Sequence, residues 1–388
     1  MRSMKLVLFL FFMTAISVGQ LRPVQWQPIS VPTTASLRGL SVVDDNTVWA
    51  SGTDGTVIRT TDSGKTWSVL AVPQADKLDF RGIRAFDAST AVIMSSGPAE
   101  QGQARVSRTT DAGKHWMLVL EEKTTGAFFD AIAFWDAQHG ILVGDPVDGH
   151  FMLYTTKDSG LTWQRVPSDK LPPALEKEGA FAASNSCLTV QGDSNVWFAT
   201  GGASVARVFR STDRGQTWQV AETPLHPANA STGIFSLAFR DAQRGVTVGG
   251  DYAHPTNSPA PNILTTVDGG RSWQSAGPSD PPGLFFSGVA DMPFDDNSPS
   301  SEPLSREIRW AVGSNGMNSM TWARKWSRKN VNNFNAVAFP SRQVGWAVGP
   351  KGGVARWSAD GHQEKPSGVS KQTQALHDMI AGTVVVKN

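Results

Sequence analysis

TTDSGKTW (residues 60–67) is the first of five copies of one octapeptide. The other copies are TTDAGKHW (109–116), TKDSGLTW (156–163), STDRGQTW (211–218) and TVDGGRSW (266–273). Their aspartates, Asp62, Asp111, Asp158, Asp213 and Asp268, are separated by 49, 47, 55 and 55 residues. Self-similarity at a nearly fixed period of this size is typical of a repeat architecture, in which each copy is one structural unit.

The chemistry of the octapeptide predicts a β-hairpin. Asp before a small residue and Gly marks a tight turn, in which the Asp oxygens accept backbone N–H bonds and Gly supplies a positive φ. The Trp that follows has a large apolar face, which we expect to be buried against the next copy. Because the same aspartate is needed five times, we interpret these residues as structural. The repeat therefore describes how the protein is built and not what it does.

Between the octapeptides the chain repeats two strand-like runs. The first runs are GLSVV (39–43), GIRAF (82–86), AIAFW (131–135), CLTVQ (187–191), SLAFR (236–240), GVADM (288–292) and AVAFP (336–340). A second run ending in glycine follows each of them, as in TVWASG (47–52) and VGWAVG (344–349). Such β-branched and aromatic runs, bounded by Gly and Asp turns, indicate strands. A third strand leads into each octapeptide and a fourth leaves from its Trp, which gives seven four-stranded units over about residues 36–357.

Two of the seven units have lost the octapeptide. The sixth keeps only MTWARKW (320–326), and the seventh ends at GGVARW (352–357) with a relic turn, SADG (358–361). Trp26, in VQWQPISV (24–31), stands where an octapeptide Trp is expected ahead of the first unit. We therefore predict that the N-terminal strand completes the last blade and closes the ring, which removes exposed sheet edges. The predicted fold is an all-β, seven-bladed β-propeller over residues 24–360.

Composition argues against several classes of ligand. The formal net charge of +1 gives no electrostatic pattern for nucleic acid or an anionic membrane surface. Cys187 is the only cysteine, which excludes an intrachain disulfide and a thiolate metal cluster. The seven histidines lack metal-ligand spacing. We therefore predict no metal, no cofactor and no nucleic-acid partner, and we expect a monomer.

The two ends of the chain differ from the repeats. Arg2 and Lys5 precede an apolar run, Leu6 to Ile16, and small residues follow at 17–19. This pattern predicts a signal peptide over residues 1–19. The apolar run is too short to span a bilayer comfortably, which favours cleavage over the alternative, retention as an anchor. The mature protein is then periplasmic or secreted, without stable membrane insertion. Residues 361–388, with MIAGTVVV (379–386), form either a tail or a strand added to a sheet edge.

Three loops depart from the repeat on the face opposite the octapeptide hairpins, where propellers place variable function. GDPVDGH (144–150) carries Asp145 and Asp148, and the insertion LPPALEKEGAFAASNSC (171–187) carries Glu178. The third loop, GGDYAHPTNSPAPN (249–262), carries Asp251 and Tyr252. We take these five residues as candidate binding residues.

A second candidate site follows from aligning the first strands of the seven units. The residues taken to start them are all polar: Arg38, Arg81, Asp130, Asn185, Ser236, Ser287 and Asn335. Since innermost strands converge on the axis, we expect a polar ring at the mouth of the central channel. Arg38 and Arg81 are its expected carboxylate contacts. The ligand that fits this pattern is a protein or peptide partner.

The octapeptide resembles the Asp-box, or bacterial neuraminidase repeat, which in its family lies on the outer hairpins of propeller blades. Five such boxes together with LRGL (37–40) and FRGI (80–83) resemble the photosystem II stability and assembly factor family. FWDAQHGILVGDP (134–146), EGAFAASN (178–185) and GIFSLAFRDAQRGVTVGGDY (233–252) resemble a bacterial, non-photosynthetic branch of it. The resemblance implies a non-enzymatic binder that assembles or holds another exported protein.

A glycoside hydrolase is the alternative, since sialidases and xyloglucan-type hydrolases also carry Asp-boxes. Sialidases grip a carboxylate with three arginines and use a tyrosine nucleophile beside a glutamate. The ring offers two arginines, and Tyr252 would need Glu178 beside it. A carboxylate pair drawn from Asp145, Glu178 and Asp251 would serve a retaining or inverting mechanism. No residue is assigned as catalytic on this evidence.

Overall fold

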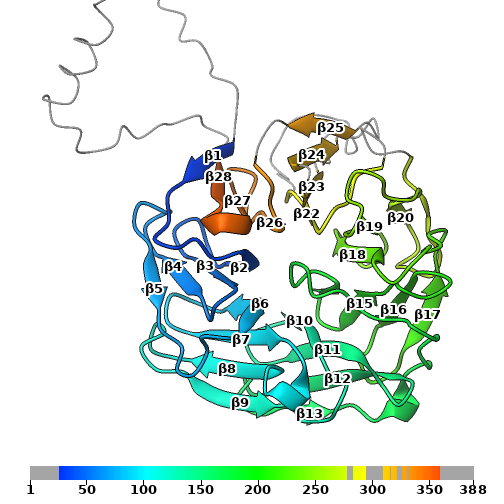
Figure 1. The fold of residues 1–388 in the computed structure, drawn as a ribbon, viewed down its shortest axis with the longest axis horizontal. Coiled ribbons are helices and arrows are strands. Elements are labelled where there is room, and N and C mark those ends of the chain that lie inside the picture. The colour runs from blue at the N-terminus through cyan, green and yellow to red at the C-terminus, as the bar shows by residue number, and fades with distance from the viewer. Residues whose placement is uncertain are drawn as a thin grey trace, which may run out of the picture. The chain divides into compact units, whose positions relative to one another are not determined.

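Seven four-stranded antiparallel sheets follow one another around a ring in the computed structural model (Figure 1). The structure describes residues 26–277, 283–293, 309–314, 316–320, 326–329 and 332–358, and Trp26–Trp357 form one compact unit. The expected signal peptide (1–19), the C-terminal segment (361–388) and most of MTWARKW and SADG lie outside the described residues. The predicted seven-bladed β-propeller is confirmed.

Each of the first six blades is built from four consecutive strands, with the innermost strand first. Blade 1 contains β2 (Leu37–Val42), β3 (Val48–Gly52), β4 (Val57–Thr60) and β5 (Ser68–Leu70). Blade 2 contains β6 (Asp79–Ala85), β7 (Ala91–Ser96), β8 (Arg105–Thr109) and β9 (Met117–Glu121). Blade 3 contains β10 (Phe129–Phe134), β11 (Gly140–Val147), β12 (His150–Thr156) and β13 (Gln164–Arg165). Blade 4 contains β14 (Leu188–Gln191), β15 (Asn195–Ala199), β16 (Arg207–Ser211) and β17 (Gln219–Glu222).

The remaining blades complete the ring. Blade 5 contains β18 (Thr232–Phe239), β19 (Gly245–Asp251), β20 (Ile263–Thr266) and β21 (Gln274–Ser275). Blade 6 contains β22 (Gly288–Asp291), β23 (Arg309–Gly313), β24 (Gly316–Met320) and β25 (Trp326–Lys329). Blade 7 contains β26 (Ala336–Ala338), β27 (Val344–Val348), β28 (Val354–Ser358) and β1 (Trp26–Ile29). Three-residue 3-10 turns η1 (Ala99–Gln101), η2 (Ser168–Lys170) and η4 (Pro350–Gly352) are also present, and no helix among the described residues has the length and apolar character to cross a bilayer.

The N-terminal strand closes the ring as predicted. β1 pairs antiparallel with β28, with Trp26 opposite Trp357 and Ile29 opposite Val354. Trp26 is buried in the apolar cluster between blades 6 and 7. It therefore supplies to blade 7 the Trp that an Asp-box supplies elsewhere.

The Asp-box turns show why their residue types recur. In the first box, Asp62 Oδ1 accepts the Thr66 N–H at 2.9 Å, and its Oδ2 accepts the Thr66 hydroxyl at 2.6 Å. The Thr60 hydroxyl donates to Asp62 and accepts the N–H of Gly64, whose φ is +83°. Equivalent bonds occur in the other boxes, except that the His115 ring nitrogen takes the place of the hydroxyl in the second box. Each of these aspartates therefore uses its carboxylate to hold its own turn.

The Asp-box Trp packs in the direction opposite to the one predicted. Trp67 belongs to the cluster between blades 7 and 1, with its ring centroid 5.8 Å from that of Trp346. Trp116, Trp163, Trp218 and Trp273 likewise join the cluster shared with the preceding blade. The turn glycine makes this approach feasible, because a Cβ on Gly64 would lie 2.6 Å from the Trp346 ring. The expectation that the Trp packs against the next copy is therefore wrong.

The core of the propeller lies between blades rather than at its centre. Buried apolar side chains of the described residues form seven clusters, and each cluster joins two adjacent blades. Every sheet therefore buries both of its faces, which is why second strands such as β3, β7 and β23 are buried at every position.

The two ends of the ring differ in what they carry. The N–H of the fourth residue of each Asp-box donates to the hairpin after the innermost strand of its own blade, as Ser63 does to Asn46 O at 3.0 Å. The five boxes therefore lie at the end where innermost strands finish, which we call the box face. We call the other end, where innermost strands begin, the mouth face.

Candidate binding face

Arg38, Arg81 and Asp130 lie on the mouth face, each in a β-bulge at the start of an innermost strand. A bulge inserts an unpaired residue and re-aims its side chain. In blade 5 the register shift falls between Ile234 and Ser236, so Phe235 occupies the bulge. The alignment that placed Ser236 in the ring is therefore wrong by one residue.

Four of the expected ring residues use their polar atoms in bonds between neighbouring blades. These bonds join Asn185 to the backbone of Ile132 (2.8 and 3.0 Å), Val289 N to Ser236 Oγ (2.9 Å), Ser287 Oγ to Asn335 O (2.9 Å), and Asn335 Nδ2 to Leu37 O (2.8 Å). Ser236 is wholly buried and Ser287 is nearly so. These residues therefore hold the blades in register, and the structure does not display them as a continuous ligand-contacting ring.

Part of the insertion lies across the mouth of the channel. We call residues 179–186 the crossing segment, because it bonds to four blades. Its contacts are Ala182 O with Arg81 Nη1 of blade 2 (2.9 Å), Asn185 with Ile132 of blade 3, Ser186 Oγ with Ser236 Oγ of blade 5 (2.6 Å), and Ser184 Oγ with Ser287 O of blade 6 (2.5 Å). The insertion was predicted to be a ligand loop, and the structure uses this part of it to cover the channel.

Two arginines on the mouth face share one carboxylate. Arg81 Nε lies 2.7 Å from Asp79 Oδ2, and Arg38 Nε lies 3.8 Å from the same oxygen. Their side chains are 27% and 28% exposed, so both remain accessible. Burial, with a smaller contribution from the neighbouring Arg81 charge, lowers the pKa of Arg38. Two cations beside one anion leave an excess positive charge that suits a further carboxylate.

Asp130, which is buried, and Asp145, which is half-buried, form an acidic pair beside this site. Asp130 is 1% exposed, and its Oδ2 has no hydrogen-bond partner within the described part of the chain. Burial and the Asp145 charge raise its pKa, and Arg81 opposes the rise. Asp145 Oδ1 accepts the Ala180 N–H at 3.0 Å, and burial raises the pKa of Asp145 to about 6. Asp145 therefore anchors the crossing segment and is not a free ligand contact.

Glu178 is fully enclosed at the base of the same insertion. Its side chain is 0% exposed and forms an ion pair with Arg207, whose Nε lies 2.9 Å from Glu178 Oε1. Glu178 also accepts bonds from the Thr200 hydroxyl (2.6 Å) and the Leu175 N–H (2.8 Å). Every carboxylate oxygen is therefore used internally, and the residue fastens the insertion to β16.

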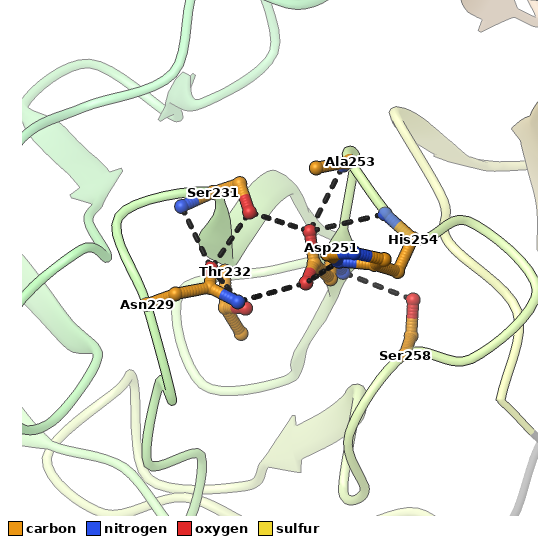
Figure 2. A network of polar contacts seen from close by, with 7 residues as sticks. All are labelled: Asn229, Ser231, Thr232, Asp251, Ala253, His254 and Ser258. Atoms are coloured by element: carbon orange, nitrogen blue, oxygen red, sulfur yellow. Dashed lines mark hydrogen bonds and ion pairs between the residues drawn. The ribbon is translucent and has the colours of Figure 1, made fainter.

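Asp251 also serves the framework. Figure 2 shows its carboxylate surrounded by donors from two loops. Ser231 Oγ lies 2.6 Å from Oδ1, and Asn229 Nδ2 and His254 Nδ1 lie 3.0 and 2.9 Å from Oδ2. Burial opposes ionisation, but bonds from Ser231, Asn229 and His254 together hold the pKa of Asp251 well below its usual range. The carboxylate thus joins residues 229–232 to the 251–258 loop.

Asp148 and Tyr252 remain on the surface. Asp148 (φ +52°) and Gly149 (φ +76°) form the turn between β11 and β12, so Asp148 has a turn role. Tyr252 is 55% exposed, with its ring centroid 6.3 Å from that of Phe181 and 6.0 Å from that of Phe235. Of the loop candidates, Tyr252 is the aromatic one, and its ring is largely exposed on the mouth face.

Sequence reasoning missed the aromatic group beneath Tyr252. Phe181 of the crossing segment stacks on Phe235 at 4.0 Å, and Phe285 meets Phe235 edge-on at 4.8 Å. A Cβ on Gly233 would lie 2.5 Å from Phe181, so glycine is needed where this ring rests. The mouth face therefore offers the exposed Tyr252 ring and the half-buried Phe181 ring, supported by the buried Phe235 and Phe285, as well as two arginines. The sequence did hold one signal for this group: Phe235 is apolar, although it occupies the bulge position at which Arg38 and Arg81 stand in blades 1 and 2.

The residues required for glycoside hydrolysis are engaged elsewhere. Glu178 is paired with Arg207, Asp251 is saturated by donors, and Asp145 bonds the crossing segment. The ring contacts of Tyr252 are with Phe181 and Phe235 and not with a glutamate. Within the described part of the mouth face, the contacts of these four residues do not favour the hydrolase hypothesis.

Comparison with known proteins identifies the repeat and the relatives. A family model for the BNR/Asp-box repeat matches residues 209–220. The photosystem II assembly protein Ycf48 of Thermosynechococcus vestitus is 26% identical over 296 residues, which is 67% of this chain and 77% of that protein.

Solved structures show the same fold. YCF48 bound to a D1 peptide superposes with a TM-score of 0.57 at 18% identity, covering 86% of this chain and 97% of that one. YCF48 from Cyanidioschyzon merolae gives a TM-score of 0.60 at 17% identity, with 86% and 98% coverage. The chain is therefore an Asp-box β-propeller similar to the photosystem II assembly factors.

Proposed function

We propose that this protein is a non-enzymatic scaffold that binds an extended segment of a partner protein on its mouth face. Arg38 and Arg81 would take a carboxylate of the segment, and the exposed Tyr252 ring would take an apolar or aromatic side chain. The observation that carries the proposal is the pair of accessible guanidiniums that share the single carboxylate of Asp79.

The relatives support a peptide ligand. One structure similar to this chain holds YCF48 with a D1 peptide, and the Thermosynechococcus vestitus relative is a photosystem II assembly protein. Extended peptides bind through a few anchoring pockets and charge contacts, which demands an accessible face more than a deep cleft. In a cell that has no photosystem II, the partner would be a protein other than D1.

The binding proposal can be tested by crosslinking and pull-down from the cell that makes the protein. The Arg38→Ala/Arg81→Ala variant should lose a partner that the wild type captures. A Lys157→Ala/Arg165→Ala variant is the matched control, because it removes the same charge from exposed positions on blade 3. Loss of the partner in both variants, or in neither, would overturn the assignment to the mouth face.

We also propose that the protein acts outside the cytoplasm, because residues 1–19 have the pattern of a signal peptide. Cell fractionation followed by N-terminal sequencing would test this. A mature chain that starts near Gln20 in the exported fraction is the expected result. A full-length chain retained in the cytoplasm would contradict it.

A further inference from the structure

The central channel holds a cavity on the inner side of the crossing segment. Its volume is about 310 Å³, and it is lined by the innermost strands of blades 1, 2, 3, 4 and 7. Asn185 of the crossing segment lines one end, and Val42, Val190 and Pro340, where these strands finish, line the other. The cavity therefore extends toward the box face, away from the site proposed above.

Arg84 is the charged side chain in the lining of this cavity. It is an exposed residue of β6, and the described part of the chain gives it neither a hydrogen bond nor an ion pair. Its guanidinium carbon lies 5.9 Å from the centroid of the Phe86 ring. The equivalent positions on the other lining strands hold the smaller residues Ser41, Ala133, Thr189 and Ala338. Among the described residues that line the cavity, Arg84 is therefore the only charged one.

An unpaired cation in a concave protein space attracts an anion. The surrounding channel wall partly desolvates the Arg84 guanidinium and lowers its pKa, but a guanidinium keeps its charge at every physiological pH. Low-dielectric walls concentrate the field of a lone charge inside a cleft. The planar fork of arginine matches a carboxylate with two parallel hydrogen bonds.

The apolar residues of the lining favour a ligand whose carboxylate is attached to an apolar group. Leu40, Val42, Val190 and Phe339 are half-buried side chains on the same cavity. They present apolar surface around the guanidinium, which a strongly hydrated inorganic anion would leave uncovered. A volume near 310 Å³ is at the low end for ligand pockets, which suits a small molecule or the last residue of a peptide.

We propose that the channel is a second ligand site, which takes a carboxylate on a small apolar body with Arg84 as its anion contact. Two sources share this chemistry: a free aliphatic monocarboxylate, and the C-terminal carboxylate of a peptide that ends in an apolar residue. Either would enter from the box face, because the crossing segment covers the mouth.

Isothermal titration of the full chain tests the proposal. One arm uses butyrate, hexanoate and octanoate, with hexanamide as the uncharged analogue. The other arm uses a short peptide ending in leucine, with its C-terminus free or amidated. Binding that requires the free carboxylate is the expected result, and the arm that binds more tightly identifies the source.

Three variants locate the site. Arg84→Gln should weaken binding at least about tenfold, whereas Arg165→Gln, which removes the same charge from an exposed position on β13, should leave it unchanged. Ala338→Leu narrows the lumen while keeping Arg84, and should also weaken binding. Because the described residues give Arg84 no hydrogen bond or ion pair to lose, and its contact with the Phe86 ring is long, the melting temperature of Arg84→Gln should stay close to that of the wild type.

Several results would overturn the proposal. The first is the absence of binding by every carboxylate, and the second is binding of hexanamide as tight as that of hexanoate. An equal loss in Arg165→Gln and Arg84→Gln would reduce the effect to net charge. Unchanged binding in both Arg84→Gln and Ala338→Leu would place the ligand elsewhere.

Discussion

The indole ring of Trp26 meets that of Trp310 edge-on, with their centroids 5.6 Å apart and their planes at 79°. Trp26 belongs to β1, which pairs with β28 in blade 7, and Trp310 belongs to β23 of blade 6. The N-terminal strand therefore contributes backbone bonds to one blade and an aromatic side chain to the interface with another. Closure of the ring depends on both.

Trp26→Ala should lower the free energy of unfolding by about 3–5 kcal/mol, because it leaves a cavity among Trp310, Phe339 and Trp357. Urea denaturation followed by tryptophan fluorescence measures the loss. Gln27→Ala, on the same strand but only half-buried, is the control and should cost far less. Equal effects of the two changes would mean that the strand is held by its backbone alone.

Asp62→Ala should lower the free energy of unfolding by roughly 1–2 kcal/mol, because Asp62 accepts both the N–H and the hydroxyl of Thr66. Thermal unfolding measures the effect. Thr61→Ala, at an exposed neighbouring position, should be nearly neutral. If Asp62→Ala instead impaired partner binding without a change in melting, the structural role of the Asp-box would be disproved.

Glu178→Ala should destabilise the fold by about 3–5 kcal/mol, because it leaves the Arg207 guanidinium buried without its partner. A second change, Arg207→Leu, should recover part of the loss by removing the stranded charge. Glu176→Ala, which alters an exposed carboxylate nearby, is the control. Chemical denaturation of the two single variants and the double variant gives the coupling free energy between Glu178 and Arg207. If the losses in unfolding free energy of the single variants simply added up in the double variant, the two residues would not act as a buried pair.

Asp145 should make stability depend on pH. Burial raises the pKa of Asp145 to about 6 from an ordinary value of 3.8, and the Ala180 N–H bond opposes the rise. Because the folded pKa is the higher one, the stabilisation is fully present below about pH 4 and is lost as the pH rises through about 6. The neighbouring Asp130 titrates with it, with Arg81 and Cys187 close by.

Asp145→Asn isolates this effect, since an amide oxygen can still accept the Ala180 N–H. Unfolding free energies of the wild type and the variant, measured between about pH 4 and pH 7, should diverge in favour of the variant as the pH rises. Parallel curves across this range would show that Asp145 does not change its ionisation there.

The fold was predictable because its signals are local. An Asp-box is a turn whose donors and acceptors lie within eight residues, so Thr60, Asp62 and Gly64 specify it without tertiary information. The closing strand was also predictable, because Trp26 stands where a box Trp is missing. The direction in which Trp67 packs was not, since it depends on which face of the sheet the turn presents.

The candidate site was less predictable because exposure is a tertiary property. From the sequence, Glu178 is indistinguishable from an exposed loop carboxylate. The structure shows that it pairs with Arg207, which lies 29 residues further along the chain. Asp251 likewise finds its donors on a separate loop. Arg38 and Arg81 were found because charged residues at the start of buried strands are unusual. Their shared partner Asp79 and the aromatic group around Phe235 could be identified only from the structure.

The crossing segment changes how the ring should come apart. Blades in a closed array touch only their two neighbours, so a strained array is expected to loosen one interface at a time. The bonds of residues 179–186 link blades 2, 3, 5 and 6 through a single stretch of backbone. Separation of one interface would also break these links across the axis. In native-state hydrogen exchange, the protected backbone amides of the blades should therefore exchange as one cooperative unit, with the same free energy of opening.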